Sequence, residues 1–265
     1  MGRGMRVTRW DTVVFLRAVV VAALALGLAW LITAATDEGG VPWGERAGRT
    51  LPLTPVCAAV GAWGALAPVR ARGEVRALEA LGRSRVQIAV AAIAGGAAIA
   101  LTAAVVLGAL RSVDVAGFYP SALHASAWHW DDGSFVNRSQ GLVVDADGTP
   151  LRVGPPIEAR PLAGIPRGGR AAASMATALA GVALPMLLAQ LLLSRHAGPS
   201  AAERLGAGRT ASRARWQAVG ASAAAIVGSM MLFQAAAARL VPALTAAVPP
   251  AALLLFAIGR YRASS

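Results

Sequence analysis

The sequence contains no lysine, and only 14% of its 265 residues are charged. Soluble domains carry about 25% charged residues. This shortage of charge, with 56% hydrophobic residues, indicates that the chain is dissolved in a lipid bilayer rather than in water. Its 25 basic residues are all arginine and stand between apolar runs, an arrangement that membrane topology explains better than nucleic-acid binding. We therefore expect no nucleic-acid partner.

The sequence lacks the residues that disulfide bonds, metal binding, ATP hydrolysis and catalysis require. Cys57 is the single cysteine, which excludes an internal disulfide framework and any multi-cysteine metal site. The chain has no GxxxxGK[ST] phosphate loop, so it is not expected to hydrolyse ATP itself. No cluster of serine, histidine and carboxylate residues lies at a consistent depth in the membrane. We expect no catalytic residues, no metal site and no cofactor, and hence a protein that is not an enzyme.

Six apolar runs are long enough, or nearly so, to cross a bilayer, which takes about 20 residues in a helix. The first follows Arg3, Arg6 and Arg9 but is about twice as long as the apolar core of a signal peptide, so we expect it to be retained. The predicted fold class is an α-helical integral membrane protein with six transmembrane helices. The predicted spans are 13–35, 51–68, 86–110, 171–194, 217–238 and 240–259.

Arginine in the short loops predicts the orientation of these spans. Loops 69–85 and 195–216 hold five arginines each, whereas loop 36–50 holds two. This alternation predicts that both termini and both basic loops lie in the cytoplasm, and that residues 111–170 lie outside. The spans contain no Asp or Glu, which counts against an ion-coupled transporter, since such proteins bury carboxylates near the middle of the membrane.

The outside loop is the only sizeable aqueous segment. "SFVNR", "GLVVDADGTPLRV" and "ASAWHW" have strand character, and Asp147-Gly148 is a hairpin signal. We expect three or four antiparallel strands in a small β-rich domain. The predicted organisation is therefore helices 1–3 over residues 1–110, a β-rich insertion over 111–170, and helices 4–6 over 171–265.

The segment from 70 to 85 is short, charged and helix-forming, between two apolar runs. Val75, Leu78 and Leu81 follow a near-helical spacing, Glu79 and Arg83 are placed to pair, and Gly82 is placed to end a helix. This pattern predicts an amphipathic helix at the cytoplasmic surface. A basic loop with incidental helicity has the same composition and stays an alternative.

The stretch "GEVRALEALGRSRVQI" resembles the coupling helix of bacterial ABC permeases, a pattern shared by the LptF/LptG (YjgP/YjgQ) lipopolysaccharide-export permeases and the FtsX/MacB type. The order of elements is similar to the LptF/LptG family, with six spans, a coupling helix between spans 2 and 3, and a β-domain between spans 3 and 4. "LPLTPVCAAVGAWGALAPVRARGEVRALEALG" also resembles that family's second span. The chain departs from the family at Gly73, where a serine is expected, and in its much shorter outside loop.

The resemblance implies a permease subunit of an ABC-type exporter of lipopolysaccharide-like lipid in the bacterial inner membrane. Its partners would be an ABC ATPase subunit, a second permease half and the membrane lipid. A non-transporting scaffold or regulator of the FtsX/MacB kind is the alternative. The residues that would bind the ATPase are Arg70, Glu74, Arg76, Leu78, Glu79 and Gly82. Arg46 and Arg49 could contact lipid phosphates, or could be interfacial arginines without a ligand.

Overall fold

A computed structural model of the chain describes most of its residues. The described ranges are 8–36, 41–119, 128–131, 133–137, 142–144, 147–148, 150–152, 165–193 and 203–264. Within them, six helical segments are long and apolar enough to cross a membrane. The predicted six spans are thus confirmed, and the chain has the make-up of a multi-pass membrane protein.

Five of the six helical segments begin before the apolar runs that predicted them, and the sixth begins later and ends later. The first span is α1 (Arg9–Thr36), and the second joins α2 (Trp43–Thr50), the 3-10 turn η1 (Leu51–Leu53) and α3 (Thr54–Ala71). A short helix, α4 (Glu74–Ala80), precedes the third span, and the 3-10 turn η2 (Ala116–Phe118) follows that span. The remaining spans and their turn are α5 (Arg85–Ala109), α7 (Gly169–Leu193), α8 (Glu203–Ala237), η4 (Ala243–Ala247) and α9 (Val248–Ser264).

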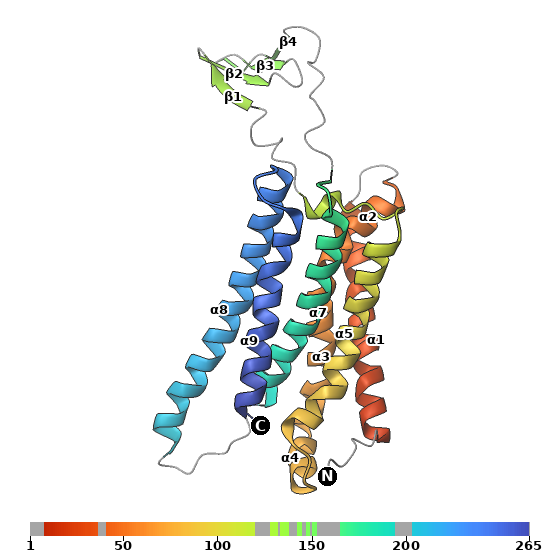
Figure 1. The fold of residues 1–265 in the computed structure, drawn as a ribbon, viewed down its shortest axis with the longest axis vertical. Coiled ribbons are helices and arrows are strands. Elements are labelled where there is room, and N and C mark those ends of the chain that lie inside the picture. The colour runs from red at the N-terminus through yellow and green to blue at the C-terminus, as the bar shows by residue number, and fades with distance from the viewer. Residues whose placement is uncertain are drawn as a thin grey trace.

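Helix α7 is the centre of the bundle. It packs against α5, α3 and α9, while α1 packs against α3 and α5, and α8 packs against α9 and η4 (Figure 1). The described chain begins and ends at the end of the bundle where α4 lies, as an even number of crossings requires (Figure 1). Helix α2 and the strands lie at the opposite end.

Glycine allows the backbones of α1, α3 and α5 to approach closely. A Cβ atom added to Gly61 of α3 would lie 2.5 Å from the carbonyl oxygen of Ala18 on α1. A Cβ added to Gly95 of α5 would collide with the carbonyl oxygen of Phe15, and one added to Gly96 with that of Ala58. Small residues therefore take the place of interlocking large side chains in this bundle.

Four short strands lie between α5 and α7. They are β1 (Trp128–Asp131), β2 (Ser134–Asn137), β3 (Leu142–Val144) and β4 (Pro150–Arg152). Each pairs antiparallel with the next, with Trp130 opposite Phe135 and Val143 opposite Leu151. Gly133 and Gly148 adopt positive φ at the two outer turns. A β-rich domain over all of 111–170 stays a prediction, because much of that segment lies outside the described residues.

Arg170, at the start of α7, holds the end of α5. Its Nη1 atom donates to the carbonyl oxygens of Leu107 and Leu110 at 2.9 and 2.7 Å, and Nη2 donates to that of Val113 at 2.9 Å. These acceptors include carbonyls that the last turn of a helix leaves unpaired. One planar guanidinium thus joins the third and fourth spans where the chain leaves the bundle.

Replacing Arg170 by methionine is expected to lower the free energy of unfolding by about 2 kcal/mol, because two part-buried carbonyls, those of Leu107 and Val113, lose a charged donor. Lysine should recover only part of this loss, since one ammonium cannot reproduce the planar fork. Thermal unfolding of the purified protein measures both effects. Arg167, an exposed neighbour on the same approach to α7, gives the control Arg167→Met. Equal melting temperatures for the two methionine variants would contradict the clamp.

Candidate functional site

Backbone geometry sets α4 apart from the helices on either side. Gly73 precedes it with φ of 74°, and Gly82 follows it with φ of 83°, a conformation that glycine adopts without strain. The N–H of Gly82 bonds to the carbonyl of Glu79, and the N–H of Arg83 to that of Leu78, a Schellman ending. Ser84 then begins α5 with a capping box. The predicted short helix within 70–85 is present, and Gly82 ends it as predicted.

The apolar residues of α4 do not all face one way. Val75 is fully buried, and Leu78 packs partly buried against the same core cluster, which includes Leu66 and Ile88. Leu81, the third residue of the predicted stripe, is 80% exposed. The stripe therefore anchors α4 to the bundle through its first two members and leaves an apolar side chain facing away from the protein.

Ion pairs hold the segment in place, but one differs from the prediction. Arg72 pairs with Glu74 at 2.9 Å, and Arg85 pairs with Glu79 at 2.7 Å. The predicted pair between Glu79 and Arg83 is wrong, because Gly82 turns the chain before Arg83 can complete the same helix face. Arg83 points instead to the start of α1.

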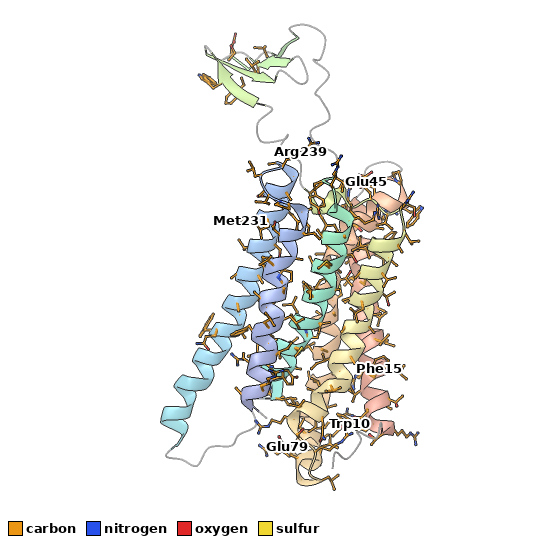
Figure 2. All side chains as sticks on the ribbon, in the orientation of Figure 1. Trp10, Phe15, Glu45, Glu79, Met231 and Arg239 are labelled. Atoms are coloured by element: carbon orange, nitrogen blue, oxygen red, sulfur yellow. The ribbon has the colours of Figure 1, made fainter. Side chains whose placement is uncertain are left out.

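Two residues of α1 complete this cluster. Asp11 Oδ2 accepts a hydrogen bond from Arg83 Nη2 at 2.6 Å, and the two side chains are only 14% and 20% exposed. The guanidinium carbon of Arg83 lies 5.3 Å from the centroid of the Trp10 ring. Trp10 Nε1 also donates a long hydrogen bond of 3.5 Å to Glu74 Oε2. We call Trp10, Asp11, Glu74 and Arg83 the α1–α4 junction; Figure 2 shows Trp10 at the same end of the bundle as Glu79.

Sequence analysis missed Trp10 and Asp11. They lie 64 and 72 residues from their partners Glu74 and Arg83, so no local spacing connects them. The available signal was the aspartate next to a tryptophan at the start of an apolar run, where a carboxylate needs a partner to be held in the protein.

The six predicted ATPase-binding residues fall into two groups. Arg76 and Gly82 are exposed, whereas Arg70, Glu74, Leu78 and Glu79 are half-buried. The surface that faces away from the bundle is formed by exposed Arg76, Ala77, Ala80 and Leu81, which we call the outer α4 surface. The side chain of Arg76 makes no hydrogen bond or ion pair within the described part of the chain. The surface therefore offers one positive charge beside one large apolar side chain.

Arg46 and Arg49 lie on α2, at the opposite end of the bundle (Figure 1). The guanidinium carbon of Arg46 is 5.8 Å from the centroid of the Trp30 ring on α1. Arg49 Nη2 lies 2.6 Å from Glu45 Oε1, four residues earlier on the same helix. Both arginines thus lie on the same short helix, and each already has a contact within the protein.

A cavity of about 470 Å³ lies between α3 and α7 on one side and α8 and α9 on the other. Its lining is almost entirely apolar; Thr177 and Ser229 contribute the hydroxyl groups, and no ionisable side chain lines it. Sequence analysis did not find it, because it forms where residues of four helices meet, and each helix alone looks like an ordinary apolar span. Ligand pockets are commonly of this size.

No protein-family model matches the chain, and neither a curated protein nor a solved structure does. What the protein does must therefore be argued from its own residues. Among the described residues, no three side chains of His, Cys, Asp or Glu come together where they could hold a metal ion. The features with distinct chemistry are the α1–α4 junction, the outer α4 surface and the apolar cavity.

Proposed function

We propose that the chain is a permease subunit of an ABC-type exporter that moves a lipopolysaccharide-like lipid out of the bacterial inner membrane, with ATP hydrolysed by a separate ATPase subunit. The observation that carries the proposal is α4, a short helix fixed at one end of six spans that offers an outer surface of Arg76 and Leu81. It supports a role in which a partner outside the membrane pushes on the bundle.

The contacts of α4 give such a push a defined route. Buried Val75 joins α4 to α3 and α5 through the core, while Arg83 and Asp11 join it to α1. A displacement of the outer α4 surface would therefore move the ends of three spans together. With both termini and α4 in the cytoplasm, as the arginine distribution predicts, an ATPase could reach this surface, and Arg46 and Arg49 would face the side toward which the lipid leaves.

A second permease half would need a large apolar face. In an 18-residue apolar stretch of α1, only 11% is buried within the chain, and the same holds for α8. In α5 and in α7 the buried share is 50%. Helices α1 and α8 are thus the spans with the most surface left for lipid or for another subunit. We propose that the second half packs there.

The Leu81→Asp variant tests the docking surface. The added carboxylate places a charge where an apolar side chain would enter the partner's groove, so association with the ATPase should fall at least about tenfold, as losing an interface anchor does. The measurement is the amount of ABC ATPase that co-purifies with the tagged chain from its native membrane. Ala263→Asp, an exposed position of α9, is the control for added charge and should co-purify normally.

The same complex, placed in nanodiscs, separates transport from scaffolding. Under the proposal, ATP hydrolysis rises when lipopolysaccharide is added and returns to its basal rate when it is omitted. An ATPase that co-purifies but hydrolyses ATP at a rate independent of lipid would support the FtsX/MacB-like scaffold instead. If no ABC ATPase accompanies the unaltered chain, both are wrong.

A further inference from the structure

The apolar cavity has its own position along the membrane. Leu53 and Phe118 line it, as does Phe233 of α8, so it lies towards the end of the bundle that carries α2. Phe233 is fixed there by rings, with centroids 5.5 Å from Phe118 and 5.2 Å from Tyr119. Burial raises the pKa of Tyr119 to about 12, and its hydroxyl donates to the carbonyl of Gly169 at 2.8 Å. The rings of Phe118 and Tyr119 thus hold the Phe233 side chain at this wall of the cavity.

The lining selects the chemistry of an occupant. Without an ionisable side chain, and with only Thr177 and Ser229 as polar side chains, the cavity has too few partners to stabilise a chain of water molecules. It lies within membrane-crossing helices, where the surrounding molecules are lipids. A flexible hydrocarbon chain satisfies such a lining, whereas a polar or charged solute would leave its own groups without partners.

A single arginine stands at the same end of α8. Arg239 has φ of 58°, the left-handed region that L-residues rarely adopt. The backbone bonds from Arg239 to Ala236 and from Leu240 to Ala235 form a Schellman ending, in which glycine usually takes this position. The exposed Arg239 side chain makes no hydrogen bond or ion pair within the described residues. A strained, unshared positive charge at a membrane edge is suited to an external anion.

Distance along the helix connects the two features. Six residues separate Phe233 from Arg239, which corresponds to about 9 Å along a helix axis. Figure 2 shows Arg239 at the end of α8, beyond Met231. The residue before Met231 in the sequence, Met230, lines the cavity. A lipid with a chain in the cavity would place its phosphate at this end of the bundle, within reach of the long arginine side chain.

We propose that this chain holds an anionic membrane phospholipid, with one acyl chain in the cavity between α3, α7, α8 and α9 and its phosphate on Arg239. The site does not depend on an ATPase partner, and this proposal is independent of the permease function proposed above.

The acyl chain is tested by filling the cavity. Ala225 lines it, whereas its neighbour Ala224 is exposed and does not. The protein is placed in nanodiscs with phosphatidylglycerol that carries a photoreactive acyl chain, and the labelled peptides are mapped. Labelling of α7 and α8 at the lining residues should fall at least fivefold in Ala225→Phe and stay unchanged in Ala224→Phe. Equal labelling in both variants would overturn the cavity as the chain's position.

The phosphate is tested by the lipid preference. Competition of the photoreactive phosphatidylglycerol with unlabelled phosphatidylglycerol or phosphatidylcholine should show about a tenfold preference for the anionic lipid, because the choline cation of phosphatidylcholine repels Arg239 and offsets the charge of the phosphate. Arg239→Gln should reduce it to less than twofold. Arg111→Gln, an exposed arginine beyond α5 at the same end, should leave it intact. A preference that survives Arg239→Gln, or is lost equally in Arg111→Gln, would overturn the role of Arg239.

Discussion

Replacing Gly96 by valine is expected to lower the free energy of unfolding by about 3 kcal/mol, the upper range for overpacking a tightly packed core. A Cβ atom at this position would collide with the carbonyl oxygen of Ala58 and lie 3.2 Å from its carbonyl carbon and 3.5 Å from the Ala62 nitrogen. All of these are backbone atoms of α3. The collision can therefore be relieved only by moving α5 away from α3, which also opens the core against which α4 is anchored.

Gly27 of α1 provides the matched control, because an added Cβ there meets nothing within 4 Å. Gly27→Val should be neutral or slightly stabilising, since glycine is the poorer helix former. Thermal unfolding in detergent or nanodiscs compares the two variants under identical conditions. If Gly27→Val and Gly96→Val have the same melting temperature, any loss of stability comes from valine in a helix and not from the contact between α3 and α5.

The spans and the short helix were accessible to sequence analysis because their signals are local. A run of apolar residues cannot stay in water, and its backbone must form a helix in lipid. For α4, Gly73 and Gly82 mark both ends, since only glycine takes positive φ there without strain. The α2 helix was missed as a helix, because its buried residues Gly44, Ala47 and Gly48 have helical spacing but are too small to form a recognisable apolar stripe. They are buried because the chain after α5 packs closely over them.

The candidate sites were only partly accessible, for a different reason. The arginines of 70–85 were found, but the partner of Arg83 was assigned to Glu79 by helical spacing, and the turn at Gly82 makes that spacing meaningless. The partner, Asp11, lies at the start of the first span, 72 residues away in the sequence. The apolar cavity depends on how four helices pack, and no residue in it is unusual by itself. Pairings over long separations and empty space are both properties of packing rather than of local sequence.

Breaking the α1–α4 junction should have a comparably large effect. Arg83→Met removes the charged partner of Asp11 and leaves a carboxylate that is 14% exposed with only its hydrogen bonds from Thr8. Removing one member of a fully buried pair costs about 3 kcal/mol or more, and this part-buried pair should lose about 2 kcal/mol. The double variant Asp11→Asn/Arg83→Met should recover much of this loss, because no buried charge is left over. The melting temperatures of the two single variants, the double variant and the parent form the cycle that measures the coupling.

The pair between Arg85 and Glu79 is the internal control, since it has the same chemistry and a similar distance of 2.7 Å, but its side chains are 40% and 29% exposed. Arg85→Met should therefore cost less than about 1 kcal/mol. A spin-label distance between the start of α1 and α4 adds a readout that a general loss of stability does not give. The distribution of this distance should broaden in Arg83→Met and stay narrow in Arg85→Met. If it stays narrow in both, α1 is held by its packing against α3 and α5, and a push on α4 would reach α1 only through those helices.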